Sequence, residues 1–134
     1  MKKSFKKLVV VFCSLLILTL AISFTAFASP KPYSNTLPTI GHKTLTSGVR
    51  ETSSSNWKHT MATYSQAPSA VVWCDAWING KWILATNNKT IINSGLPSNF
   101  NWDKFIPIKD TAVRLRAQGS SLGGKAIVGV IDFE

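Results

Sequence analysis

Residues 69–86 read SAVVWCDAWINGKWILAT, and this stretch decides the fold. Asn79-Gly80 lies between two runs that are rich in valine, isoleucine and tryptophan. That dipeptide is the strongest short-range signal for a β-hairpin with a two-residue type I′ turn. Such a turn pairs Ile78 with Lys81 and Trp77 with Trp82. The tryptophans are then expected at a close pair without backbone hydrogen bonds, where aromatic side chains touch across the strands.

Side chains of this hairpin alternate between its two faces. One face carries Trp73, Asp75, Trp77, Trp82 and Leu84, and the other carries Val72, Cys74, Ala76, Ile78, Ile83 and Ala85. Two apolar faces are unusual, because an antiparallel pair normally shows one face to water. One face must therefore be core. The other is either covered by residues 87–110 or open as an aromatic surface for a ligand such as a sugar, a lipid or a protein.

A period of two continues along the chain from Lys43 onward. Alternating runs at 57–65, 111–118 and 125–133 predict further strands. Residues 87–110 are rich in Asn, Ser, Gly and Pro and predict a long loop. We therefore expect an all-β domain, a small antiparallel β-sandwich or open barrel of about six or seven strands.

The first 28 residues have the three regions of a secretory signal peptide. Four lysines precede an apolar run at 8–22, and Ala26-Phe27-Ala28 supplies the small-x-small pattern before the expected cleavage site. Residues 29–42 contain three prolines and are expected to be an extended, poorly ordered leader. The β-domain is then expected to span 43–134. These features predict a secreted protein without stable membrane insertion after cleavage.

Cleavage would change the charge and the cysteine count. The whole chain has 15 basic and 6 acidic residues, a net charge of +9. Removing the four lysines of residues 1–28 leaves 11 basic against 6 acidic residues, a net charge of +5. This value suits weak attraction to anionic partners. A nucleic-acid interface is not expected, because no block of basic residues follows Lys7. Cys74 would be the one remaining cysteine, expected in the core, with a disulfide between two chains as the alternative.

A second candidate surface lies on the run at 111–118. Arg114 and Arg116 share one side of this predicted strand, and Val113, Leu115 and Ala117 share the other. The arginines are expected to be exposed, as part of a solvated face or as a bidentate grip on phosphate or carboxylate. Candidate ligand-binding residues are therefore Trp73, Asp75, Trp77, Trp82, Arg114 and Arg116.

Nothing in the sequence predicts an enzyme, a cofactor or a metal site. The pattern Gly119-Ser120-Ser121-Leu122-Gly123 matches the hydrolase elbow, yet strands flank it and no histidine follows it. The two histidines, His42 and His59, have no carboxylate or cysteine at ligand spacing.

The order of features along the chain resembles a known family. A signal peptide and a short arm precede residues 48–52 (GVRET), the Trp57-Lys58 strand and an aromatic strand pair, and residues 113–117 (VRLRA) and 128–132 (VGVID) close the chain. This layout is similar to the small secreted β-sandwich proteins of Gram-positive bacteria that include lactococcin-type bacteriocins. The resemblance implies export and action on the cell envelope of competing cells, with a wall precursor as the partner. The net charge adds an anionic polymer, and the tryptophan face adds a polysaccharide, as candidate envelope partners. The alternative is an extracellular carbohydrate- or matrix-binding module that uses an exposed tryptophan face.

Overall fold

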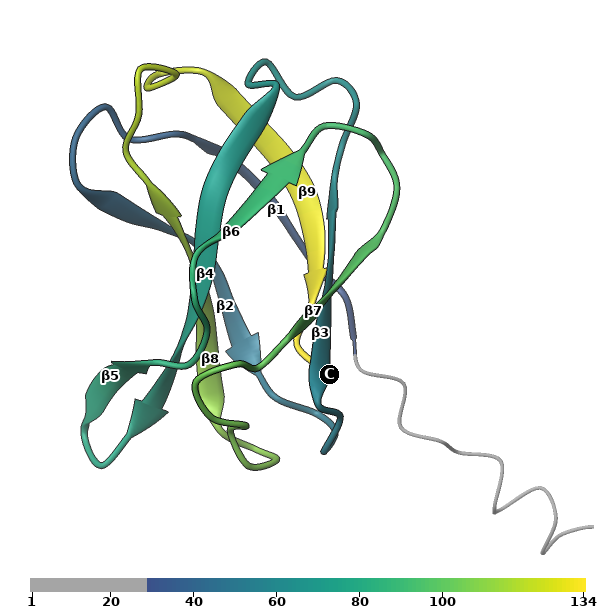
Figure 1. Cartoon of the computed structure of the whole chain (residues 1–134), viewed down its shortest axis with the longest axis vertical. Coiled ribbons are helices and arrows are strands. Elements are labelled where there is room, and N and C mark those ends of the chain that lie inside the picture. Colours follow the sequence, from purple (N-terminus) through teal and green to yellow (C-terminus); the bar gives the residue numbers. More distant parts are fainter. Residues whose placement is uncertain (1–28) are drawn as a thin grey trace, which may run out of the picture.

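A computed structural model describes residues 29–134, which form nine strands and no helix (Figure 1). The expected signal peptide, residues 1–28, lies outside the described residues. The strands are β1 (Lys31–Thr36), β2 (His42–Val49), β3 (Asn56–Met61), β4 (Ser69–Ile78), β5 (Lys81–Leu84), β6 (Lys89–Ile92), β7 (Ser98–Asn101), β8 (Ala112–Gln118) and β9 (Ala126–Asp132). The prediction of an all-β antiparallel domain is confirmed. No helix within 29–134 is long and apolar enough to cross a membrane.

Two antiparallel sheets make up the domain. The first has the strand order β1-β9-β3-β7, and the second has the order β2-β8-β4-β5. Strand β6 also pairs with β4 in the second sheet. The long β4 thus pairs with β8 on one side, and with β6 at its start and β5 at its end on the other. As Figure 1 shows, the β4–β5 hairpin projects at the lower end of the molecule.

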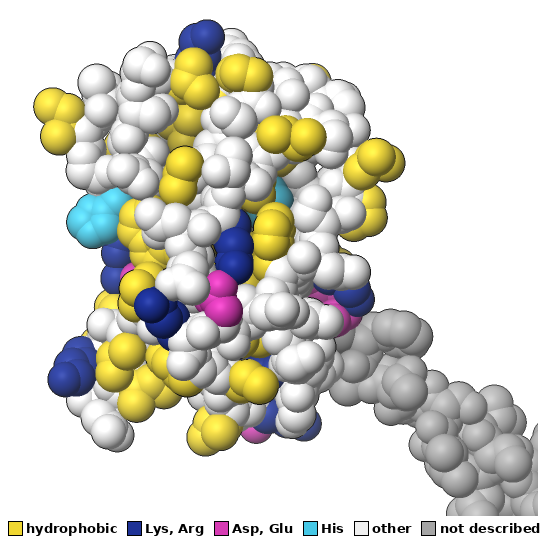
Figure 2. All heavy atoms as spheres, viewed as in Figure 1, with side chains coloured by type: hydrophobic (Ala, Val, Ile, Leu, Met, Phe, Trp, Pro, Cys, Tyr) yellow, Lys and Arg dark blue, Asp and Glu magenta, His cyan; other side chains and the backbone are white. Residues whose placement is uncertain are grey.

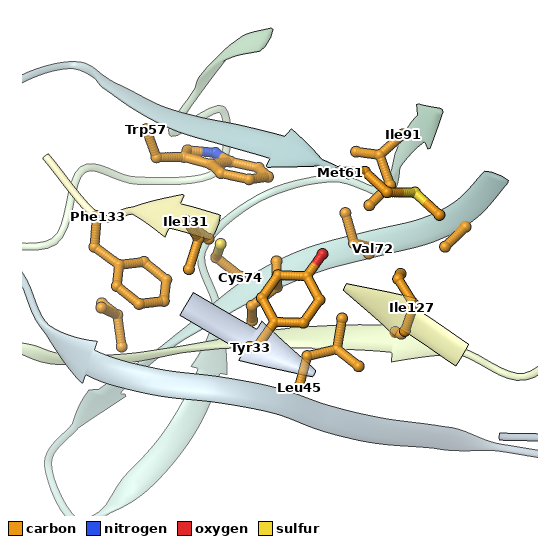
Figure 3. Close-up of a cluster of buried hydrophobic side chains, with 14 of the residues drawn as sticks. Tyr33, Leu45, Trp57, Met61, Val72, Cys74, Ile91, Ile127, Ile131 and Phe133 are labelled. Carbon is orange, nitrogen blue, oxygen red and sulfur yellow. The ribbon is translucent and has the colours of Figure 1, made fainter. Parts of the chain in front are cut away.

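The core lies between the two sheets, where the inward side chains of both meet (Figure 3). Trp57, Met61, Ile127 and Ile131 come from the first sheet, and Val72, Cys74, Val113 and Leu115 come from the second. Each of these side chains is at most 1 % exposed. Cys74 is fully buried, as predicted, which keeps its thiol away from a second chain in the folded protein. Burial also raises the pKa of this thiol well above its ordinary value.

The hairpin prediction is confirmed in its register. Ile78 pairs with Lys81 and Trp77 pairs with Trp82. Asn79 and Gly80 have φ values of 50° and 79°, as a type I′ turn requires. The Trp77 and Trp82 rings lie 5.2 Å apart between centroids, in an edge-to-face arrangement.

The prediction of a poorly ordered leader at 29–42 needs correction, because Lys31–Thr36 and His42 lie in strands of the sandwich. Lys31–Thr36 forms β1 and pairs along its length with β9. Pro32 is tolerated because β1 is the outermost strand of its sheet, where a missing N–H breaks no inner ladder. The tyrosine beside it, Tyr33, is buried in the core. The domain boundary predicted at residue 43 is therefore too late.

The expected loop at 87–110 is also more ordered than its composition indicates. It contains β6, which pairs with the start of β4, and β7, which pairs with β3. Both strands have only four residues, too few to show a periodic pattern. These two strands and β1 raise the count above the expected six or seven.

Candidate functional site

All six candidate residues lie on the outer face of the second sheet. The pairing of β4 with β8 sets Trp73 opposite Arg116 and Asp75 opposite Arg114. The β4–β5 hairpin adds Trp82 opposite Trp77. The sequence predicted a tryptophan surface and an arginine surface separately, and the structure merges them. We call Trp73, Asp75, Trp77, Trp82, Arg114 and Arg116 the tryptophan–arginine face.

Asp75 is the centre of this face and is only 7 % exposed. Its Oδ2 accepts a hydrogen bond from Nε of Arg114 at 3.0 Å and lies 2.9 Å from Nη2 of the same residue. Nη1 of Arg116 lies 3.5 Å from the same oxygen. The indole Nε1 of Trp73 donates to Oδ1 at 3.1 Å. Both carboxylate oxygens are therefore engaged by neighbours on the face.

The arginines are layered with the aromatic rings around this carboxylate. The Arg114 guanidinium lies 4.3 Å from the centre of the Trp82 ring. The Arg116 guanidinium lies 5.9 Å from the centre of the Trp73 ring. Both distances are within the range of cation–π attraction, which favours each guanidinium beside its indole. Ring packing therefore fixes where the charges lie.

His42 adds a further ring to this face. Nothing in the sequence indicates that it lies there. Its ring stacks on Trp73 with 5.8 Å between the ring centroids. It begins β2, and β2 reaches this face only through its pairing with β8. A residue 31 positions from Trp73 gives no local signal of that contact.

The face is open to solvent in part. Trp77 is 45 % exposed, while Trp73 and Trp82 are half-buried. Residues 105–108 pack near Ile78 and Ile83, on the opposite side of the hairpin. The question left by the two apolar hairpin faces is thus answered: the Val72–Cys74–Ala76 side is core, and the tryptophan side is an accessible surface.

The arginines are less exposed than predicted. Their side chains are 20 % exposed for Arg114 and 12 % for Arg116, because Trp73, Trp82 and Asp75 cover them. The alternation of the strand correctly places them on the outer face. It does not reveal that neighbouring strands carry large side chains that lean over them.

The electrostatic balance of the face favours an anion. Two guanidinium groups share one carboxylate, so the six residues carry a net charge of +1. Nε of Arg116 is buried and has no hydrogen-bond partner among the described residues. Burial, and then the positive charge of Arg114, lower the pKa of the Arg116 guanidinium. A bound phosphate or carboxylate would offset that repulsion.

The part of the chain that the structure describes shows no group of metal-binding type on this face. Within 29–134, no three His, Cys, Asp or Glu side chains gather closely enough to hold a metal ion. His59 lies in the core, where its Nε2 is 2.6 Å from the hydroxyl of Tyr33.

Comparison with known proteins found no relative of this chain. No protein-family model, curated protein or solved structure that was compared matches the chain. Its function is therefore inferred from the chemistry of its own surface.

Proposed function

We propose that this protein is secreted, acts without catalysis and binds an anionic component of the bacterial cell envelope through the tryptophan–arginine face. One observation carries the proposal. Trp73 and Trp82 lie against two arginines whose combined charge is only half compensated by Asp75, and Trp77 packs on Trp82. Indole rings suit sugar rings and apolar groups, whereas guanidinium groups suit phosphate and carboxylate. Envelope polymers and wall precursors combine these two chemistries in one molecule.

Two features of the sequence support the location. Residues 1–28 have the pattern of a signal peptide, and removing them leaves a net charge of +5. The layout of the remaining chain resembles lactococcin-type bacteriocins of Gram-positive bacteria. We therefore expect the protein to act on the envelope of other cells as a bacteriocin.

The test is titration of the purified protein with teichoic acid, an anionic wall polymer, followed by tryptophan fluorescence. We expect a spectral change whose midpoint moves to higher polymer concentration as salt is added, because charge contributes to binding. Arg114→Gln should weaken binding about fivefold or more, since a charge-assisted hydrogen bond is lost. Lys125→Gln is the matched control, because it removes one exposed charge from the turn before β9.

Three results would count against the proposal. They are the absence of any spectral change, equal weakening by Lys125→Gln, and tight binding that ignores salt. Growth inhibition of Gram-positive bacteria by the purified protein tests the bacteriocin assignment separately. If the protein binds the polymer without inhibiting growth, envelope binding stands and the bacteriocin assignment fails.

The second candidate is a module that binds neutral carbohydrate, favoured by the exposure of Trp77. Asp75 argues against it, because sugar hydroxyls would have to compete with two arginines and an indole for its oxygens. This candidate would be favoured if a neutral polysaccharide bound with an affinity that neither salt nor Arg114→Gln changed. The same polysaccharide should then fail to bind the Trp77→Ser variant.

A further inference from the structure

A second exposed surface lies at the lower end of the molecule, beyond the core. Here the tip of the β4–β5 hairpin meets residues 105–108. Together they line an open groove of about 340 Å³. Its walls are Ile78, Ile83, Phe105, Ile106, Pro107 and Ile108, which we call the apolar tip. Figure 2 shows hydrophobic side chains gathered at this end, with basic side chains near them.

Two side chains of the apolar tip project into solvent. Ile106 is 51 % exposed and Ile108 is 77 % exposed, while Pro107 between them is buried. Single exposed apolar residues are ordinary on protein surfaces. Two that flank a groove lined only by apolar residues form a contiguous patch, and such patches mark interaction sites.

The backbone holds this patch in place. Arg50, which is fully buried, donates hydrogen bonds from its guanidinium to the carbonyls of Pro107 and Ser54. The N–H of Thr111 donates to the carbonyl of Ile108 at 3.2 Å, and the N–H of Lys104 donates to that of Ala85 at 3.1 Å. The isoleucines are therefore presented by an anchored segment.

Lysines surround the apolar tip. Lys81 starts β5 beside the turn, and Lys104 and Lys109 flank residues 105–108. All three are exposed, and none forms an ion pair with another residue of the described chain. Two acidic residues adjoin these lysines in sequence: Asp103, which forms an ion pair with Lys89, and Asp110. The rim therefore carries more positive than negative charge.

We propose that the apolar tip docks on the surface of an anionic lipid bilayer. Ile106 and Ile108 enter the boundary between headgroups and acyl chains, and the lysines contact lipid phosphates. Apolar residues rimmed by lysines are the combination by which peripheral proteins bind such membranes. A second copy of the chain is a poorer occupant, because a symmetric contact would bring like-charged lysines together. This proposal concerns a surface other than the tryptophan–arginine face and does not depend on it.

The experiment is co-sedimentation of the purified protein with vesicles of phosphatidylglycerol and phosphatidylcholine in equal parts. The double variant Ile106→Ser, Ile108→Ser should bind about tenfold more weakly, because each side chain loses several buried carbons. Lys104→Gln should weaken binding about fivefold, and added salt should weaken it further. Vesicles of phosphatidylcholine alone should bind little.

The matched control is Ile92→Ser in β6. Ile92 is 61 % exposed, and it pairs with Ser69 at the start of β4, the end of that strand away from the hairpin tip. It should bind like the unchanged protein. Equal losses in the control and the double variant would overturn the proposal, as would full binding by the double variant. So would loss of binding in Arg114→Gln with no loss in the double variant, since lipid headgroups would then occupy the tryptophan–arginine face. Self-association that needs the isoleucines, without vesicle binding, would assign the tip to a second copy.

Failure here is distinguishable from failure of the envelope proposal. Teichoic acid has a phosphate backbone and no bilayer, so we expect its binding to depend on Arg114 and to be unchanged by the loss of Ile106 and Ile108. A protein that binds the polymer but no vesicle retains the first proposal and loses the second. Thermal unfolding of each variant checks that the exposed substitutions leave the fold intact.

Discussion

Oδ2 of Asp75 lies 3.0 Å from Nε and 2.9 Å from Nη2 of Arg114, so one carboxylate oxygen joins the middle of β4 to the middle of β8. Asp75 is 7 % exposed, and the Arg114 side chain is 20 % exposed. A partly buried pair of this kind is screened less by solvent than a surface ion pair. The same contact holds the Arg114 guanidinium against Trp82. It therefore belongs both to the stability of the sheet and to the shape of the proposed binding face.

This contact predicts a measurable coupling between the two residues. A double-mutant cycle with Asp75→Ala and Arg114→Ala should give a coupling free energy of about 1 kcal/mol, from urea unfolding. The cycle with Lys31→Ala and Glu51→Ala is the control, because those charges lie 3.5 Å apart with 34 % and 30 % exposed side chains. Its coupling should be about 0.3 kcal/mol or less. Equal couplings in the two cycles would contradict the assigned role of Asp75.

The hairpin turn predicts a cost that comes from backbone conformation alone. Gly80 has φ of 79°, and a Cβ added there would meet no atom within 4 Å. Gly80→Ala should lower the free energy of unfolding by about 1 kcal/mol, because an L residue is strained in the left-handed region. Unfolding in urea measures the change. A neutral result would mean that the turn relaxes to another type.

A substitution at Gly129 should lower the free energy of unfolding for a different reason, a steric clash without backbone strain. A Cβ there would lie 2.5 Å from the carbonyl oxygen of Thr60 and 2.7 Å from the hydroxyl of Tyr33. The first of these is backbone of the neighbouring strand β3 and cannot rotate away. Gly129→Ala should therefore cost about 2 kcal/mol or more, exceeding the cost of Gly80→Ala in the same assay. A smaller loss than in Gly80→Ala would show that β3 and β9 separate easily.

Local patterns could predict the hairpin, the alternation of side chains along the long strands and the burial of Cys74. These follow from a period of two and from turn chemistry, which act between residues close in sequence. The tryptophan–arginine face could not be predicted as one site. It needs β4 beside β8, two strands separated by 33 residues, and no local signal encodes that pairing.

The missed strands have a related physical cause. Tyr33 in β1 is buried because β9 pairs with its strand, although Pro30 and Pro32 shortly before it indicate a loop. In β7, Phe100 packs on Trp57 with 4.7 Å between ring centroids, although Ser98 and Asn99 indicate a turn. Tertiary packing overrides weak strand propensity in both short segments.

The buried pair of Tyr33 and His59 predicts a pH dependence of stability. Burial lowers the pKa of His59 from its ordinary value of 6.5 to about 4. Between these values the unfolded chain binds a proton at this residue and the folded chain does not. The free energy of unfolding therefore keeps its full value above about pH 6.5. It decreases as pH falls toward 4, by about 3 kcal/mol at most from this residue.

His59→Gln should remove this loss, so that the free energy of unfolding changes less between about pH 7 and about pH 4.5 than in the unchanged protein. Urea unfolding at the two pH values measures the difference, and carboxylates common to both proteins cancel in the comparison. Tyr33→Phe is the control. It removes the 2.6 Å hydrogen bond but leaves His59 buried, so it should lower stability and keep the slope. If His59→Gln retains the full slope, the acid sensitivity comes from other groups, and His59 is accessible to protons in the native state.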